Sequence, residues 1–210
     1  FPADPNTTIG FFGGETCAYR LTLTTRGFVD RAFPLAVTEG ASTPVAAEGW
    51  NLPSPAPALA PSPGRDDPDG RAATAAGLSG EAVVRVVSFG AVVEKEPNGP
   101  DRPQELTLPV AVSGRVDPEG DADAFAFRAS KGAPLTLRVE SRGLGMPLDP
   151  VLKVLDASGK VVAEGDDEGS DPDPRLAFTP AADGTFRAVV RDLNGRGSPR
   201  HVYRLVIQPP

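Results

Sequence analysis

The sequence predicts an all-β protein made of two β-sandwich domains, the C-terminal one jelly-roll-like. Glycine and proline supply 23 and 24 of the 210 residues, a share typical of chains with many turns. Apolar and polar residues alternate in short runs, as in half-buried strands. No window of about eleven or more residues shows the 3.6-residue apolar spacing of an amphipathic helix.

The first 24 residues predict the closing hairpin of a preceding copy of the C-terminal domain. A Gly-Gly turn precedes alternating residues, and the triplet Tyr-Arg-Leu occurs at 19–21 and again at 203–205, each time after a turn that contains glycine. Repetition of this kind indicates an internal repeat. Chance matching of three letters is the alternative.

Residues 25–90 predict a small β-sandwich. Two strand-like runs, 28–37 and 43–53, are separated by a turn at Glu39 and Gly40, and a further strand is expected at 81–89. Between them, residues 53–70 contain six prolines, which supply no ladder donors and favour extended backbone. We expect an exposed proline-rich loop between strands of one domain; an interdomain linker is the alternative.

The remaining residues, 91–210, predict a second and larger sandwich. Alternation is regular in several runs, such as Phe125, Phe127 and Ala129. Eight short strands at this spacing favour two packed antiparallel sheets of jelly-roll type. The expected strands are 108–116, 123–129, 133–141, 150–156, 160–164, 174–179, 184–192 and 201–208.

Composition excludes several functions. The net charge of −7 and the pI of about 4.8 disfavour nucleic acid as a partner, because a phosphate backbone would be repelled. No apolar run approaches the roughly 20 residues of a membrane span. The single cysteine, Cys17, cannot form an intrachain disulfide.

An ordered series of motifs resembles the bacterial pre-peptidase C-terminal domain over residues 91–208. The series begins with Glu-Lys-Glu-Pro-Asn at 94–98 and Asp-Ala-Asp-Ala-Phe-Ala-Phe at 121–127. It continues with Leu-Asp-Pro at 148–150, Asp-Asp at 166–167, Ala-Asp-Gly-Thr-Phe at 182–186 and Tyr-Arg-Leu at 203–205. Position 186 holds Phe where the family more often has Tyr.

The resemblance implies a secreted or cell-surface β-sandwich without catalytic activity, attached to extracellular proteases and other large exported proteins. The same segment is similar to the collagen-binding domains of clostridial collagenases, in which the acidic lead-in segment and the D-x-D strand hold calcium. Residues 25–90, with Gly-Trp-Asn-Leu-Pro at 49–53, resemble an immunoglobulin-like module of multidomain planctomycete proteins.

Calcium is the cofactor that the residues themselves favour. Side chains at i, i+2 and i+4 of an extended segment point to one side, and Glu94, Glu96 and Asn98 have this spacing. Asp121 and Asp123 offer a second such pair, and calcium needs six to eight oxygen ligands. These five residues form the predicted site. The alternative is that the two glutamates solvate a linker while the two aspartates cap a strand end.

Other polar groups have simpler interpretations. The acidic loop 165–173 lacks the spacing of an EF-hand, and we expect it to be a solvated turn. The single histidine, His201, is expected on the surface at a strand edge, without a catalytic partner. Trp50 is expected to pack inside the first domain, with an exposed partner anchor as the alternative.

The sequence therefore predicts a non-catalytic module of a large exported bacterial protein, serving adhesion, spacing or substrate binding and stabilised by calcium. Its expected partners are other domains of the same polypeptide and an extracellular protein or polysaccharide. Two alternatives stay open: an accessory or substrate-targeting domain of a secreted peptidase, and a carbohydrate- or collagen-binding module with an exposed aromatic row.

Overall fold

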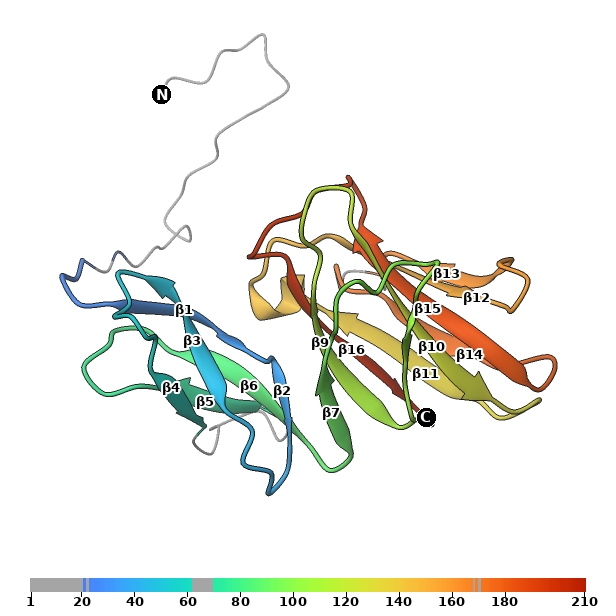
Figure 1. Ribbon diagram of the computed structural model, residues 1–210, viewed down its shortest axis with the longest axis horizontal. Coiled ribbons are helices and arrows are strands. Elements are labelled where there is room, and N and C mark those ends of the chain that lie inside the picture. The colour runs from blue at the N-terminus through green and yellow to red at the C-terminus, as the bar shows by residue number, and fades with distance from the viewer. Residues whose placement is uncertain (1–20, 22, 62–69, 168, 170) are drawn as a thin grey trace, which may run out of the picture.

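The protein is folded almost entirely from strands, as the computed structural model in Figure 1 shows. The structure describes residues 21, 23–61, 70–167, 169 and 171–210. Within these, the one helical element is a single 3-10 turn, Arg142–Leu144. The prediction of an all-β fold is confirmed. Cys17 and most of the hairpin predicted for residues 1–24 lie outside the described residues.

Residues 28–87 form one six-stranded sheet, here called the six-stranded module. Its strands are β1 (Phe28–Phe33), β2 (Ala36–Thr38), β3 (Val45–Trp50), β4 (Ala58–Pro61), β5 (Gly70–Thr74) and β6 (Ala82–Val87), in the spatial order β1-β3-β4-β5-β6-β2. The sheet curls, since Phe28 also bridges to Ser79 beside β6. Small apolar residues, among them Val29, Val45 and Val84, fill the core.

Proline explains where the strands of this module differ from the expected runs. The run 28–37 is divided at Pro34, and its second part, β2, pairs in parallel with β6 at the other end of the sheet. The stretch 53–70, expected to be a loop, contains the strand β4, and β5 begins at its last residue; the two strands pair with each other. Both flanks of the proline tract therefore belong to one sheet.

Residues 90–208 form two further sheets of five strands each, here called the sandwich. One sheet has the order β13-β12-β15-β10-β8 and the other β14-β11-β16-β9-β7. The strands are β7 (Gly90–Val93), β8 (Gln104–Glu105), β9 (Val110–Arg115), β10 (Ala122–Ala129), β11 (Leu135–Glu140), β12 (Pro150–Leu155), β13 (Val161–Gly165), β14 (Arg175–Phe178), β15 (Gly184–Asp192) and β16 (Val202–Gln208). All eight expected strands are present. β7 and β8 were not expected, because strands of two to four residues are too short to show alternation.

The core of the sandwich lies between its two sheets. Alternate residues of β10, β11 and β16 point inward, and the side chains of Phe127, Leu137 and Leu205 are fully buried there. Phe178 and Phe186 meet edge to face, with ring centroids 5.1 Å apart and an interplanar angle of 70°. This is a preferred geometry for aromatic pairs.

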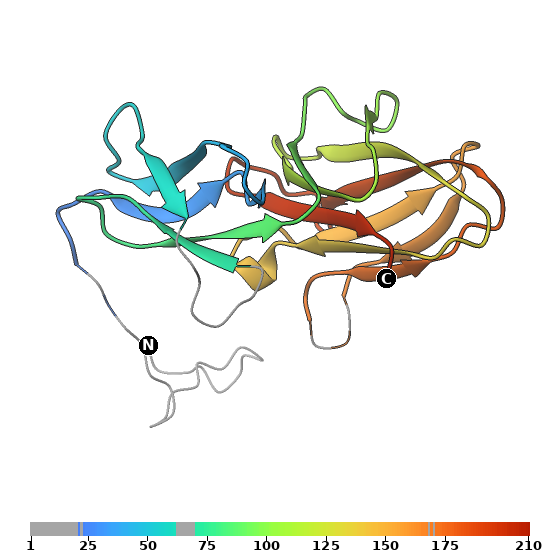
Figure 2. The ribbon, with the colours of Figure 1, turned by 90° about the horizontal axis from the view of Figure 1, so that it is seen from below.

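The six-stranded module lies against the outer face of the sheet that contains β9 and β16, as Figures 1 and 2 show. We call this contact the joint. Ala36 and Val87 of the module pack against Ala111 and Val206 of the sandwich. The Ser113 hydroxyl accepts hydrogen bonds from two backbone N–H groups of the module.

Ion pairs surround this apolar centre. The two partners in each pair come from the module and the sandwich: Glu48 with Arg115 at 2.8 Å and Asp30 with Arg200 at 3.0 Å. Trp50 is 55% exposed, so the expectation that it packs inside the module is wrong. Its ring instead lies 5.3 Å from the guanidinium carbon of Arg200, which places it at the edge of the joint.

Replacing Phe127 by alanine tests the core of the sandwich. Removal of a fully buried ring leaves a cavity, and we expect a loss of about 3–5 kcal/mol in the free energy of unfolding. Val162→Ala on the exposed face of β13 is the control, with an expected change within about 0.5 kcal/mol. Urea denaturation measures both, and equal effects of the two changes would contradict this assignment of the core.

Candidate metal centre

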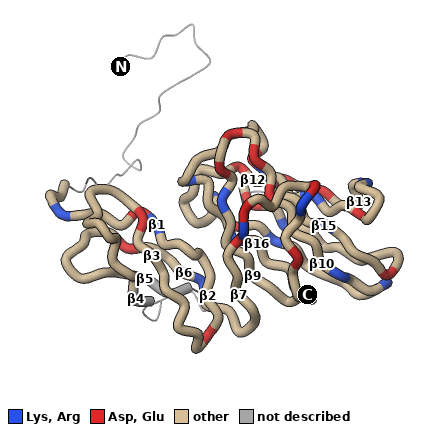
Figure 3. The backbone as a smooth tube through the Cα atoms, in the orientation of Figure 1, with Lys and Arg blue, Asp and Glu red and all other residues tan. Residues whose placement is uncertain are grey.

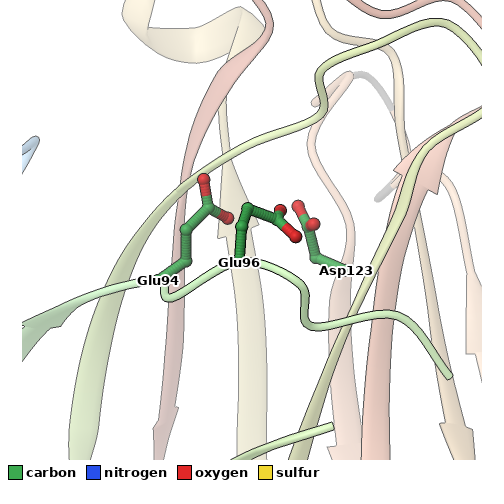
Figure 4. A group of neighbouring side chains, drawn as sticks. All are labelled: Glu94, Glu96 and Asp123. Atoms are coloured by element: carbon green, nitrogen blue, oxygen red, sulfur yellow. The ribbon is translucent and has the colours of Figure 1, made fainter. Parts of the chain in front are cut away.

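Three carboxylates converge at the rim of the sandwich where the chain leaves β7. Glu94 and Glu96 lie on the lead-in segment, residues 94–98, and Asp123 lies near the start of β10. One oxygen from each lies within 4.8 Å of the others, and Figure 4 shows the three side chains reaching toward one another. Packing of the two sheets therefore brings together two parts of the predicted site.

Asn98 completes this cluster. Its side chain is fully buried, and its terminal amide lies 3.0 Å from Asp123 Oδ1 and 3.2 Å from Glu96 Oε1. With the amino group in that position the amide donates to both carboxylates. With the oxygen there, four side chains present oxygens to a common point. The Ala124 N–H donates to the Asn98 carbonyl at 2.7 Å and fixes the segment against β10.

Asp121, the fifth predicted ligand, is placed differently. Its two carboxylate oxygens accept the backbone N–H groups of Asp117 at 3.0 Å and Ala122 at 2.8 Å. These hydrogen bonds close the turn before β10, as the strand-cap alternative predicted. Asp121 is close enough to add negative potential to the cluster.

Tyr203 and Gly114 belong to the centre although sequence reasoning assigned neither to it. The fully buried Tyr203 hydroxyl donates to Asp123 Oδ2 at 2.7 Å. A Cβ atom at Gly114 would overlap the Tyr203 ring and lie 2.6 Å from Glu94 Oε2. Glycine is thus required where β9 passes under the site. The sequence signal for Tyr203 is the Tyr-Arg-Leu motif at 203–205, which by itself does not indicate a contact with Asp123.

The electrostatics of the cluster favour a positive charge. Burial, then the charges of Glu96 and Asp121, raises the pKa of Glu94 to about 7, although the Arg115 N–H that donates to it acts in the opposite direction. Burial and the Glu94 charge raise the pKa of Asp123 to about 9. Glu94 Oε2 is buried without a hydrogen-bond partner. A cation bound by these oxygens would offset both the cost of burying the carboxylates and the repulsion between their charges.

The donor set fits a hard cation. The three carboxylates offer only oxygen, the Asn98 amide can offer its oxygen when it is turned over, and neither histidine nor cysteine takes part. Carboxylate and amide oxygens are the usual ligands of calcium, whereas zinc and copper sites in proteins normally use imidazole or thiolate.

His201 is buried at 9% exposure, so the expectation of a surface histidine is wrong. Its Nδ1 lies 2.7 Å from the Ser198 hydroxyl, which also accepts the Arg200 N–H. The His201 N–H donates to the Ser198 carbonyl, so these contacts build the turn before β16. Nearby Asp192 accepts three backbone N–H groups, which hold the pKa of its carboxyl low despite burial.

The acidic loop is only partly the solvated turn that was expected. Figure 3 shows acidic residues, in red, on the loops at the upper end of the sandwich. Asp166 and Asp167 are exposed, but Asp173 is buried and accepts the N–H groups of Ser141, Arg142 and Gly143. Asp173 therefore caps the 3-10 turn rather than facing solvent.

No family model and no curated protein sequence matches this chain. Among solved structures, it is similar to the pre-peptidase C-terminal domain of a collagenase from Bacillus anthracis. That match has 17% identity and a TM-score of 0.38, over 50% of this chain and 93% of that domain.

Two other solved structures show comparable similarity. One is PliG of Aeromonas hydrophila, a periplasmic inhibitor of g-type lysozyme, with 10% identity and a TM-score of 0.39 over 58% of this chain and 98% of that one. The other contains the CBM51-2 and INT domains of ZmpB from Clostridium perfringens. It has 12% identity and a TM-score of 0.32, over 83% of this chain and 46% of that one.

The raised pKa values predict how the metal-free protein responds to pH. In the unfolded chain these carboxyls ionise near pH 4, whereas in the folded protein Glu94 and Asp123 keep protons up to about pH 7 and 9. The folded state therefore binds more protons in this window, and the free energy of unfolding falls as pH rises. Urea denaturation in chelator at pH 5, 6, 7 and 8 measures this fall.

Asp123→Asn removes the group with the higher pKa and should flatten the pH dependence. Asp166→Asn in the exposed loop is the control and should keep the slope of the unsubstituted protein. A metal-free stability that rises between pH 5 and 8 would contradict the assignment.

Proposed function

We propose that this chain is a non-catalytic β module of a large exported bacterial protein, and that calcium stabilises it by fixing residues 94–98 on the sandwich. The observation that carries the proposal is the convergence of Glu94, Glu96 and Asp123 around the buried Asn98 amide. The unpartnered, buried Glu94 Oε2 supports it further.

Calcium suits this centre better than magnesium. Calcium accepts six to eight oxygens in irregular arrangements, whereas magnesium requires a near-ideal octahedron and retains much of its water. Glu94 is half-buried and Glu96 is exposed, so water can supply the ligands that the protein does not. Glu94, Glu96, Asn98 and Asp123 would hold the ion, while Asp121 would contribute only its charge.

The ion would act as a mechanical link rather than as a catalyst. Residues 94–98 form the connection between β7 and the rest of the sandwich, and Asp123 belongs to β10 in the opposite sheet. An ion bound to both ties the two sheets together at their rim. The single histidine is held within a turn by Ser198, an arrangement that serves structure.

Carbohydrate binding is less well supported than a role beside other domains. A sugar-binding face would be expected to carry a row of exposed aromatic side chains. Among the large hydrophobic residues that are exposed in the described part of the chain, Trp50 is the one aromatic, and Arg200 lies over its ring. Spacing or adhesion beside other domains is therefore the preferred role. The part of the chain that the structure describes contains no helix that could span a membrane.

Calcium titration of thermal stability tests the proposal. At about one hundred times the dissociation constant, a ligand specific for the folded state adds about 2.7 kcal/mol. For a domain of this size we expect the melting temperature to rise by roughly 5–10 °C relative to chelator. Differential scanning calorimetry measures the shift, and magnesium at equal concentration should give a smaller one.

Two variants localise the effect. Glu94→Gln and Asp123→Asn each remove a charge from the centre and should abolish most of the calcium-dependent shift. Asp166→Asn removes the same charge from the acidic loop and should leave the shift intact. A calcium response that persists in both centre variants, or that disappears in the loop variant, would place the ion elsewhere.

A further inference from the structure

We infer that calcium binding at the candidate centre and docking of the six-stranded module are coupled through residues 113–115 of β9. The inference rests on the proposed function, because it takes the ion to be bound by residues of the lead-in segment and Asp123. It goes further by assigning the joint as the element whose formation the ion favours.

The side chains of two of these residues hold the joint. The Ser113 hydroxyl accepts the N–H groups of Leu35 at 3.0 Å and Ala36 at 3.2 Å, and it is fully buried. The Arg115 guanidinium pairs with Glu48 at 2.8 Å and lies 4.8 Å from the centroid of the Phe33 ring. Successive side chains of a strand point to opposite faces, so Gly114 between them faces the centre.

The backbone of the same three residues contacts the centre. The Glu94 N–H donates to the Ser113 carbonyl at 3.0 Å, and the Arg115 N–H donates to the Glu94 carboxylate. At Gly114, no side chain separates the strand from Glu94 Oε2. Because Glu94 is hydrogen-bonded on both sides of this glycine, a shift of Glu94 must shift β9 where β9 holds the module.

A second connection runs through the start of the lead-in segment. The Thr38 hydroxyl of the module donates to the Phe89 carbonyl at 3.1 Å and accepts the Ala91 N–H at 2.9 Å. β7 then runs alongside β9 and ends at Val93, directly before Glu94. The module therefore contacts both strands that position Glu94: β7, which leads directly into it, and β9, to which it is hydrogen-bonded.

Because of these contacts, the ion binds the protein with the docked module more tightly than the protein with the undocked module. Three neighbouring carboxylates repel one another when they are ionised and no cation is bound, and the force falls on a segment that is hydrogen-bonded to β9, the strand that holds the module. A ligand shifts a conformational equilibrium by its difference in affinity for the two states. Calcium bound to the ordered lead-in segment therefore favours the docked module, and docking raises calcium affinity by the same factor.

Amide hydrogen exchange measured by NMR tests whether calcium favours the docked module. The amides of Leu35 and Ala36 report on the joint directly, because their hydrogen-bond acceptor is the Ser113 hydroxyl. Calcium chloride should slow the exchange of both amides by about fivefold or more, the lower end of usual coupling factors. Ala73 in β5 takes part in none of these contacts and should be unchanged.

Calorimetric titration with calcium chloride alone tests whether docking of the module raises the affinity for calcium. Ser113→Ala removes the acceptor of two joint hydrogen bonds but keeps the carbonyl that binds Glu94, and it should weaken calcium binding by about fivefold or more. Ser141→Ala is the matched control. Its hydroxyl is equally buried and donates to the Val202 carbonyl, outside the joint, so calcium affinity should change by less than about twofold.

The outcomes separate this inference from the proposed function. If the unsubstituted protein binds calcium while exchange at Leu35 and Ala36 stays constant, the coupling is wrong and the metal centre stands. Equal calcium affinity in both serine variants likewise overturns the coupling and leaves the metal centre in place. Absence of calcium binding by the unsubstituted protein overturns both. Should Ser113→Ala fail to fold, the exchange measurement on the unsubstituted protein decides alone.

Discussion

The arrangement of this protein depends on how three neighbouring carboxylates are kept together at one rim of a sandwich. Burial makes Glu94 and Asp123 harder to ionise, and the neighbouring negative charges add to this effect, which is why the pKa values of these two groups are raised. Protons or a cation can relieve this cost. The choice between them matters structurally, because protons neutralise each oxygen separately whereas one ion holds several oxygens at fixed distances.

The sandwich supplies the rigid parts that keep the cluster from dispersing. Asp123 is held from below by the buried Tyr203 hydroxyl, and Tyr203 belongs to the central strand of the opposite sheet. Asn98 is held by its carbonyl to β10. The lead-in segment is thus the one part of the cluster that is not within a strand, so it is the part whose ordering an ion would favour, against the conformational entropy that the segment loses.

The fold was predictable from local patterns, and the site only partly so. Alternation placed all eight principal strands of the sandwich, and Glu94, Glu96 and Asn98, which have i, i+2, i+4 spacing, lie together in the structure. Asp121 has the same local spacing relative to Asp123, but a turn captures its oxygens. Spacing alone does not distinguish a ligand from a cap, since both use carboxylates near a strand end.

Contacts between distant segments were beyond prediction for a physical reason. Tyr203 meets Asp123, and Ser113 meets Leu35, across sequence separations of 80 and 78 residues. Which residues become neighbours there depends on strand register, and a shift of one residue would turn every side chain to the opposite face. The burial of His201 and the exposure of Trp50 were mispredicted for a related reason, since both lie at or near contacts between elements.

The contacts of the joint hold the six-stranded module and the sandwich together as one mechanical unit. Buried hydrogen-bond donors are costly when unpaired, and the two module N–H groups that Ser113 satisfies belong to buried residues. Separation of the module would expose the apolar contact of Ala36, Val87, Ala111 and Val206 to water as well. Both costs oppose undocking, and neither depends on the ion. The ion would therefore adjust an equilibrium that already favours the docked state, so its largest effect is expected where that state is weakened, as in a chain that lacks the Ser113 hydroxyl.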